Sequence, residues 1–325
     1  MPKKVPETVE SPLQLSAELE ALLDDADQFA EDDLAERTRE AYTSHNRRFL
    51  LWCKEHKVSG VPASPQALRG FLVYRAQRGL KVKTLAMDLA AIVHHHRSCG
   101  YADPTTHPAV VRTWMGLCKK LGTAQTKKAA ITVEVLRKML VELPEGLVGV
   151  RDRALLTLGF AGGFRRSELV GLDVSGLKFV RGGMEVTLVR SKTDQTAAGH
   201  LKEIANGQDP DTCPVRAMRE WLRLGKVQDG PIFRAVNKHG HVSPTRLTGQ
   251  SVRFVMKRAL NVAGIPGDDF SPHSLRVGFV TTAKERGIDD GSIMKVTGHK
   301  SLQTMHGYDR RVQRWKDPAT AKLGL

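Results

Sequence analysis

The stretch GHKSLQTMHGYDR, residues 298–310, gathers histidine, lysine, arginine and tyrosine side chains close to the carboxyl end of the sequence. His299 follows a glycine at an expected helix start, and Tyr308, nine residues later, is one of only four tyrosines in the chain. A phenol is protonated at neutral pH, so it attacks a phosphate only with a base or a strongly positive site beside it. Tyr308 is therefore either an ordinary buried tyrosine or a nucleophile in a cationic site.

Four more side chains that could act on a phosphate precede this stretch. Arg165 follows a Gly-Gly break and begins an expected helix, and Lys192 lies in the tight turn RSKTDQ. His273 and Arg276 are three residues apart, so they share one face of a helix. Each is weak evidence alone, because most arginines and lysines are solvated surface residues.

The elements that must position these residues begin with a helical region at 33–121. Apolar residues at helical spacings predict four helices there, one of which starts at Ser64 as N-cap with Pro65 in its first turn. A polar, small-residue linker is expected at 122–130, and Thr132 is the expected N-cap of the helix that follows it.

The remaining residues, 131–325, predict a larger domain of mixed structure. Alternating residues around a turn at Gly182 and Gly183 predict three short antiparallel strands. From CPVRAMREWLRL onward the pattern is helical, and we expect helices to the end of the chain.

Charge is distributed unevenly along the sequence. The 325 residues have a formal net charge of +15 and a pI near 9.8. Residues 1–36 hold two lysines against eleven acidic residues, so residues 37–325 carry a net charge of +24. The acidic leader, 1–32, is expected to be flexible. A positive charge as large as that of residues 37–325 is typical of proteins that neutralise nucleic-acid phosphates. The simpler alternative is a surface that is cationic for solubility alone.

Several other classes of protein are disfavoured. No apolar run approaches the roughly 18 residues of a transmembrane helix and no secretion signal is present, which predicts a soluble intracellular protein without membrane contact. The adjacent histidines of AIVHHHRSCG point in three directions on a helix, so we expect no metal and no cofactor there, and place them on a DNA-facing side. The cysteines are interpreted as reduced because they are far apart in sequence: Cys53, Cys99, Cys118 and Cys213.

In combination and order, GGFRRSEL, Lys192, HSLR and TGHKSLQTMHGY resemble the motifs of the tyrosine recombinases, or phage integrase family. LLWCKEH, RGLKVKT and HRSCGYADPT are similar to the helical core-binding domain of the Cre-like subgroup. The fold class that this resemblance implies is mainly α with a small antiparallel β-sheet. It has an N-terminal SAM-like domain of four or five helices and a C-terminal α+β catalytic domain, forming a C-shaped clamp on DNA.

The resemblance implies a site-specific recombinase that cleaves and rejoins DNA strands through a 3′-phosphotyrosine intermediate and a Holliday junction, without ATP or metal. Tyr308 would be the nucleophile, His273 its base, and Lys192 the acid that protonates the leaving 5′-oxygen. Integration, excision and multimer resolution all remain open.

The same resemblance gives roles to the residues around the phosphate. Arg165 and Arg276 would bind its non-bridging oxygens, for which a guanidinium fork is suited. His299 would donate a hydrogen bond to the phosphate, and Glu168 would orient its neighbours. The spacing to Glu168 favours Arg165 over the adjacent Arg166 as the first arginine.

DNA contacts are expected in both domains. In the first domain the matching positions lie on helices that face DNA in the family. In the second domain Lys238 is an expected phosphate contact, and Gln250 is either a base reader or a solvated side chain. The first-domain candidates are Arg47, Lys83, Thr84 and Met87.

The partners implied are double-stranded DNA with an inverted-repeat target site, a homotetramer on two duplexes linked by the last helix of each chain, and possible accessory proteins. A location in the cytoplasm at the nucleoid, in a bacterial or phage-derived system, is implied as well. Two alternatives remain: a DNA-binding protein of this fold without catalysis, and a nicking-closing enzyme of the type IB topoisomerase kind.

Overall fold

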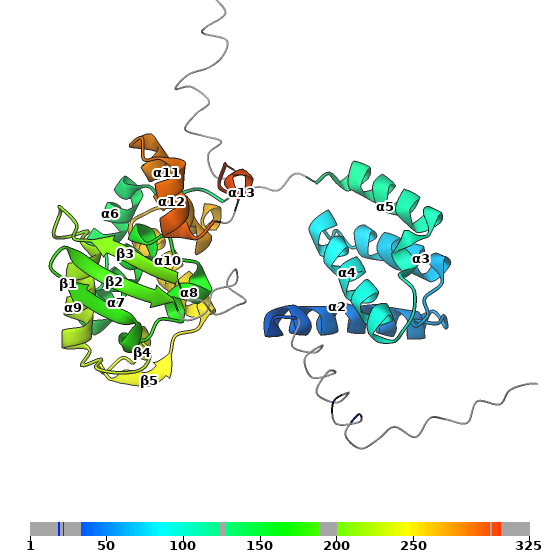
Figure 1. The fold of residues 1–325 in the computed structure, drawn as a ribbon, viewed down its shortest axis with the longest axis horizontal. Helices are drawn as coiled ribbons and strands as arrows, with labels where there is room; N and C mark the ends of the chain where they lie inside the picture. The colour runs from blue at the N-terminus through cyan, green and yellow to red at the C-terminus, as the bar shows by residue number, and fades with distance from the viewer. Residues whose placement is uncertain are drawn as a thin grey trace, which may run out of the picture. The chain divides into compact units, whose positions relative to one another are not determined.

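The computed structural model describes residues 34–123, 128–188, 200–299 and 301–306, with Leu19 and Leu22 in addition. The chain divides into two compact units, Met1–Thr126 and Lys127–Leu325 (Figure 1). Apart from the two leucines, the acidic leader lies outside the described residues. Among the described helices, none is long and apolar enough to cross a membrane.

The first unit contains the four predicted helices. Ser64 caps the second one, its hydroxyl accepting a hydrogen bond from the Ala67 N–H at 3.1 Å, and proline occupies the first turn as expected. The described elements are α2 (Glu36–Glu55), α3 (Pro65–Gln77), α4 (Val82–Ser98), the 3₁₀ turn η1 (Pro104–Thr106) and α5 (Pro108–Leu121).

The helices of the first unit enclose an aromatic core and one buried carboxylate. Phe49 and Phe71 pack edge to face with ring centroids 5.0 Å apart. Asp88 on α4 is fully buried, and its oxygens accept from Arg75 Nε at 3.0 Å and pair with His45 Nδ1 at 2.6 Å. These contacts join α2, α3 and α4 through one negative charge.

The adjacent histidines are expected from the sequence to lie on a DNA-facing side, but they do not all face outward. His96 is 1% exposed; its Nδ1 donates to the Ile92 carbonyl at 2.8 Å and its Nε2 accepts from the Ala63 N–H at 2.9 Å. His94 packs against the Tyr42 ring at 5.2 Å between centroids. The expectation of a common DNA-facing side was wrong for His96, because its ring is buried and binds the backbone of Ala63 in the loop before α3.

The second unit combines helices with two small sheets, as the fold class predicts. Thr132 caps its first helix by accepting from the Val135 N–H at 3.3 Å. The elements are α6 (Val133–Val141), α7 (Leu147–Ala161), α8 (Arg166–Val170), η2 (Val174–Gly176), β1 (Leu177–Val180), β2 (Gly183–Leu188), β3 (His200–Ala205), α9 (Pro214–Leu224), β4 (Arg234–Val236), β5 (Val242–Arg246), α10 (Gly249–Val262), η3 (Gly267–Asp269), α11 (His273–Glu285), α12 (Asp290–Thr297) and α13 (Leu302–His306).

The predicted three-stranded sheet is present, in the order β1-β2-β3 with antiparallel pairs. β1 and β2 are joined by the predicted glycine turn, and Val180 pairs with Gly183. β2 and β3 pair as far as Leu188 and His200. The connection between them, 189–199, lies outside the described residues.

The expectation of helices from α9 onward was wrong over one segment. β4 and β5 form an antiparallel hairpin between α9 and α10. The Asn237 side-chain oxygen accepts from the N–H groups of His239 and His241, and Gly240 adopts φ +81°. The asparagine side chain stabilises this turn through local hydrogen bonds, and the helical periodicity of the flanking segments gives no sign of it.

Candidate active site

The first arginine is placed by a glycine turn at the end of α7. Gly163 has φ +52°, a conformation that suits glycine, and a Cβ there would lie 3.1 Å from side-chain atoms of Phe279 and Thr297. The chain then enters α8, for which Arg165 is the N-cap. The Gly-Gly break seen in the sequence therefore turns the chain tightly enough to aim Arg165.

Arg165 is held by Glu168 one helical turn later. The Glu168 carboxylate accepts from Arg165 Nη1 at 2.5 Å and from the Arg165 backbone N–H at 2.9 Å. Glu168 is 4% exposed, whereas the Arg165 side chain is 21% exposed. The side chain of Arg166 instead lies against Gly249, at the start of α10. Glu168 thus orients Arg165 and leaves part of its guanidinium accessible.

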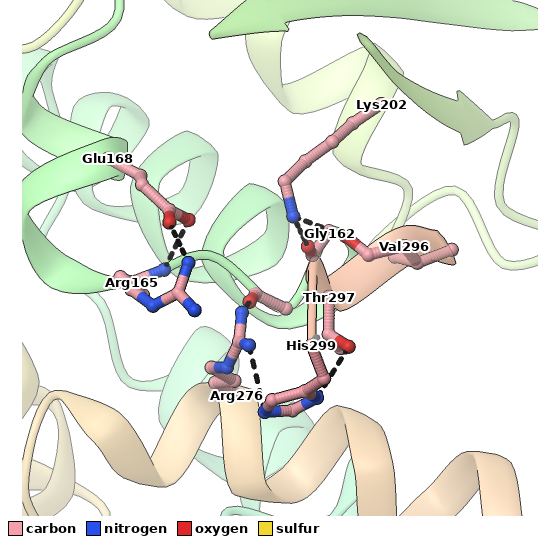
Figure 2. Close-up of polar contacts among 9 residues, drawn as sticks. Gly162, Arg165, Glu168, Lys202, Arg276, Val296, Thr297 and His299 are labelled. Atoms are coloured by element: carbon pink, nitrogen blue, oxygen red, sulfur yellow. Dashed lines mark hydrogen bonds and ion pairs between the residues drawn. The ribbon is translucent and has the colours of Figure 1, made fainter. Parts of the chain in front are cut away.

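Arg276 lies deeper than Arg165 and joins two segments of the site. It is 1% exposed, and its Nη1 donates to the Gly163 carbonyl at 2.7 Å. Its Nη2 contacts His299 Nε2 at 2.9 Å (Figure 2). Arg276 on α11 therefore connects the glycine turn at Gly163 to His299, two residues beyond the end of α12.

His299 lies directly after a helix end, not at the helix start that was expected. α12 ends at Thr297, and Gly298 caps it in the left-handed conformation with φ +66°. The end of α12 thereby turns the chain so that the His299 ring faces Arg276.

The hydrogen bonds of His299 define its tautomer. Thr297 Oγ1 donates to the Ile293 carbonyl at 2.7 Å, so it accepts from His299 Nδ1 at 2.7 Å. Nε2 then accepts from Arg276. Burial and the nearby Arg276 and Arg165 guanidinium groups lower the pKa of His299 to about 4, so the ring is neutral at pH 7. Both ring nitrogens are engaged within the protein and Nε2 carries no hydrogen in this tautomer, so donation to a phosphate requires Nε2 to leave Arg276 and to gain a proton.

His273 is the first residue of α11, one turn before Arg276. Its pKa is lowered by burial and by the charges of Arg276 and Arg165. An imidazole with a lowered pKa is neutral at pH 7 and can accept a proton. The geometry thus brings His273, Arg165, Arg276 and His299 close enough for their charges to act on one another.

A further residue of this cluster was not anticipated from the sequence. Lys202 on β3 is 1% exposed and influences the pKa of His299. With Arg165 and Arg276 it supplies three cationic groups beside the carboxylate of Glu168. The only sequence signal was its inward position in an alternating strand, two residues from His200.

Two candidate residues cannot be placed, because Lys192 and Tyr308 lie outside the described residues. The nucleophile and the acid implied by the resemblance therefore stay predictions. Within the part of the chain that the structure describes, no group of three or more histidine, cysteine or acidic residues could hold a metal ion.

The DNA-contact candidates of the first unit lie on its surface. Lys83 and Met87 are exposed one turn apart on α4, and Thr84 between them is half-buried. Lys83 and Thr84 belong to the first turn of α4, and Arg47 is exposed on α2. Asp88, also on α4, points instead into the core.

The DNA-contact candidates of the second unit are exposed as well. Lys238 lies in the turn between β4 and β5, and Gln250 is the second residue of α10. The segment SPTRLTGQSVRFVMKRAL, expected to be a helix, begins in β5 and becomes helical only at Gly249. Thr248 begins α10 by accepting from the Ser251 N–H at 3.2 Å.

Comparison with known proteins agrees with this architecture. The phage integrase family model matches residues 129–313, and the model of the phage integrase N-terminal SAM-like domain matches residues 26–98. The chain is 34% identical over 298 residues to an integrase/recombinase XerD homolog of Selenomonas ruminantium, covering 90% of this chain and 87% of that protein. It is 25% identical over 304 residues to the recombinase Cre of Escherichia phage P1, covering 85% and 87%.

Solved structures show the same fold. The Tn1549 transposon integrase in complex with circular intermediate DNA superposes with a TM-score of 0.63 at 14% identity, covering 91% of this chain and 96% of that one. A lambda integrase dimer bound to a COC′ core site gives 0.59 at 16% identity, covering 91% and 79%. The family model over residues 129–313 and the 34% identical relative show that the chain belongs to the phage integrase family of tyrosine recombinases.

Proposed function

We propose that this protein is a site-specific recombinase that cuts and rejoins DNA strands through a covalent bond between Tyr308 and a 3′-phosphate. The observation that carries the proposal is that the guanidinium groups of Arg165, partly exposed, and Arg276, buried, lie close to each other and to His273 and His299. Fixed cationic groups held together in a site with little solvent attract and stabilise an anion. A DNA phosphate is the anion that this site would bind.

The two arginines serve different purposes in the proposed reaction. Attack at phosphorus builds negative charge on the non-bridging oxygens, which preorganised donors stabilise. Arg165, partly exposed and oriented by Glu168, would bind these oxygens first. Arg276, buried against Gly163 and His299, would supply a fixed positive field and join the phosphate when His299 Nε2 releases it.

Proton transfers complete the proposed reaction. His273, kept neutral by its lowered pKa, would take the proton from the Tyr308 hydroxyl as its oxygen attacks phosphorus. The bond from phosphorus to the 5′-oxygen breaks, and Lys192 would protonate that oxygen. The resulting 3′-phosphotyrosine is reversed when a 5′-hydroxyl of another strand attacks it. Because protein cations stabilise the charge, the proposed steps need neither ATP nor a metal.

The proposed complex has both units on double-stranded DNA. Arg47 and Lys83 would contact phosphates from the first unit and Lys238 from the second, while Gln250 would read a base edge. Four chains on two duplexes with inverted-repeat sites would exchange strands through a Holliday junction, with or without accessory proteins. We place this activity in the bacterial cytoplasm, at the nucleoid.

Covalent trapping tests the proposal most directly. The wild type and Tyr308→Phe are incubated in EDTA with a library of nicked, double-stranded DNA from the source locus, and adducts that survive SDS are digested with protease and sequenced. We expect adducts at 3′ ends with the wild type and none with Tyr308→Phe, although both bind DNA. Tyr101→Phe, which removes an exposed tyrosine of the first unit, is the matched control and should form adducts normally.

The alternatives give different results in the same experiment. DNA binding without adducts from the wild type would favour a binding protein that lacks catalysis. A nicking-closing enzyme would form adducts and relax a supercoiled plasmid that has no target site, but it would not exchange strands. Adducts formed by Tyr308→Phe would show that another residue is the nucleophile.

A further inference from the structure

Lys202 is a buried lysine that the proposed chemistry does not use. It lies on β3 opposite Val186 of β2, and its neighbours on the same face of the strand are His200 and Ile204. Only 1% of Lys202 is exposed, so its ammonium group cannot contact a DNA phosphate directly. Lysine is almost never fully buried without partners, which raises the question of what this ammonium group holds.

The partners of Lys202 are carbonyl groups at two helix ends. Its Nζ donates to the Gly162 carbonyl at 2.8 Å and to the Val296 carbonyl (Figure 2). Gly162 ends α7, and Val296 lies in the last turn of α12. Carbonyls at helix ends lack partners within the helix and carry the negative end of its dipole, so a cation is stabilised there.

The surroundings of the ammonium group are otherwise apolar or cationic. It lies 4.7 Å from the centroid of the Phe164 ring. Burial lowers the pKa of Lys202 to about 8; Glu168 opposes this effect, and Arg276 and Arg165 add to it. The group is therefore predominantly charged at pH 7 and loses its charge at moderately alkaline pH.

The two carbonyls belong to the segments that carry the site. One residue after Gly162, the Gly163 carbonyl accepts from Arg276. One residue after Val296, the Thr297 hydroxyl accepts from His299. A single ammonium group thus bridges the backbone on both sides of the contact between Arg276 and His299.

We propose that Lys202 is a positioning residue that fixes the ends of α7 and α12 relative to each other and thereby sets the contact between Arg276 and His299. The inference rests on the proposed recombinase activity for its consequence in catalysis. Displacing reacting groups by about 1 Å can slow an enzyme by about 100-fold, so such a bridge matters for rate even though it never touches DNA.

The first test compares Lys202→Met, which keeps an unbranched side chain of similar size but removes its charge, with Lys178→Met. Lys178 is an exposed lysine on β1 of the same sheet. Well below the melting temperature of each variant, we expect Lys202→Met to bind DNA with a Kd within about twofold of wild type and to form the covalent adduct about 10- to 100-fold more slowly. Lys178→Met should match wild type in both. A folded Lys202→Met with a wild-type cleavage rate overturns the proposal.

A second measurement does not depend on cleavage, and it follows the wild-type protein. In the wild-type protein, ¹⁵N NMR of the His299 ring, assigned by its loss in His299→Gln, is followed from pH 6.5 to 10.5 together with the Lys202 side-chain signal. We expect the His299 ring signals to shift with the midpoint at which Lys202 loses its proton. His299 signals that stay constant through that midpoint overturn the inference. A wild type without cleavage activity counts against the proposed function, while this titration still tests the bridge.

Discussion

Two buried charge clusters in this protein differ in their balance. In the first unit, the carboxylate of Asp88 is enclosed by Arg75 and His45, so one anion meets one permanent cation and one imidazole. In the described part of the second unit, the carboxylate of Glu168 lies beside three cationic groups, those of Arg165, Arg276 and Lys202.

We interpret the difference as one between a structural cluster and the cluster that carries the proposed function. A balanced cluster satisfies its own groups, and what it adds to the protein is the connection of α2, α3 and α4. An excess of positive charge in a buried site would favour an incoming anion such as the phosphate of the proposed reaction. The pKa values of His273 and His299 are lowered first by burial and then by the charges of Arg276 and Arg165, and the second of these causes reflects the excess.

The largest expected effect is on the unbalanced cluster. Arg165→Lys keeps the positive charge but removes the planar fork that binds two phosphate oxygens. We expect adduct formation to slow by about 100- to 1000-fold, the usual effect of losing one transition-state donor. Single-turnover cleavage measures this. The control is Arg166→Lys, whose side chain lies against Gly249, and it should stay within about threefold; near-normal cleavage by Arg165→Lys would contradict a fork that acts on the phosphate.

The balanced cluster should respond in stability and not in chemistry. Asp88→Asn leaves Arg75 without its buried anion, and we expect the free energy of unfolding to fall by about 3 kcal/mol, as when one partner of a buried ion pair is removed. Urea unfolding measures the change. Asp268→Asn, which breaks an exposed pair with Lys257, should leave unfolding unchanged. A selective loss of cleavage in folded Asp88→Asn would remove the distinction between the clusters.

The smallest effect concerns pH and His299. Its pKa is about 4 in the folded protein against 6.5 for a free imidazole, so the unfolded chain binds a proton more readily between these values. The contribution of His299 to stability is therefore fully present above pH 6.5 and is lost as the pH is lowered toward 4. Thermal unfolding of the wild type and His299→Gln across this range should show a shallower decline in the variant. Equal declines in both proteins would show that His299 is not held neutral by the cluster.

Much of the fold could be read from local signals. Ser64 with Pro65, and Thr132, mark helix starts because a side-chain oxygen can satisfy a backbone N–H only at that position. The strands around Gly182 were predicted for a similar reason, since alternation and a glycine turn are local properties. The β4–β5 hairpin was missed because Asn237 stabilises its turn through side-chain hydrogen bonds that leave no periodic trace.

The sequence by itself identified most residue types of the site. A glycine pair before Arg165, an H-x-x-R segment and a histidine after glycine can all be recognised from their spacing along the chain. Only the tertiary structure decided their partners. Lys202 reaches carbonyls 40 and 94 positions away in the chain, and the tautomer of His299 depends on Arg276, 23 positions away. Such contacts follow from how α7, α11, α12 and β3 pack, and packing is a property of the whole unit that no local pattern contains.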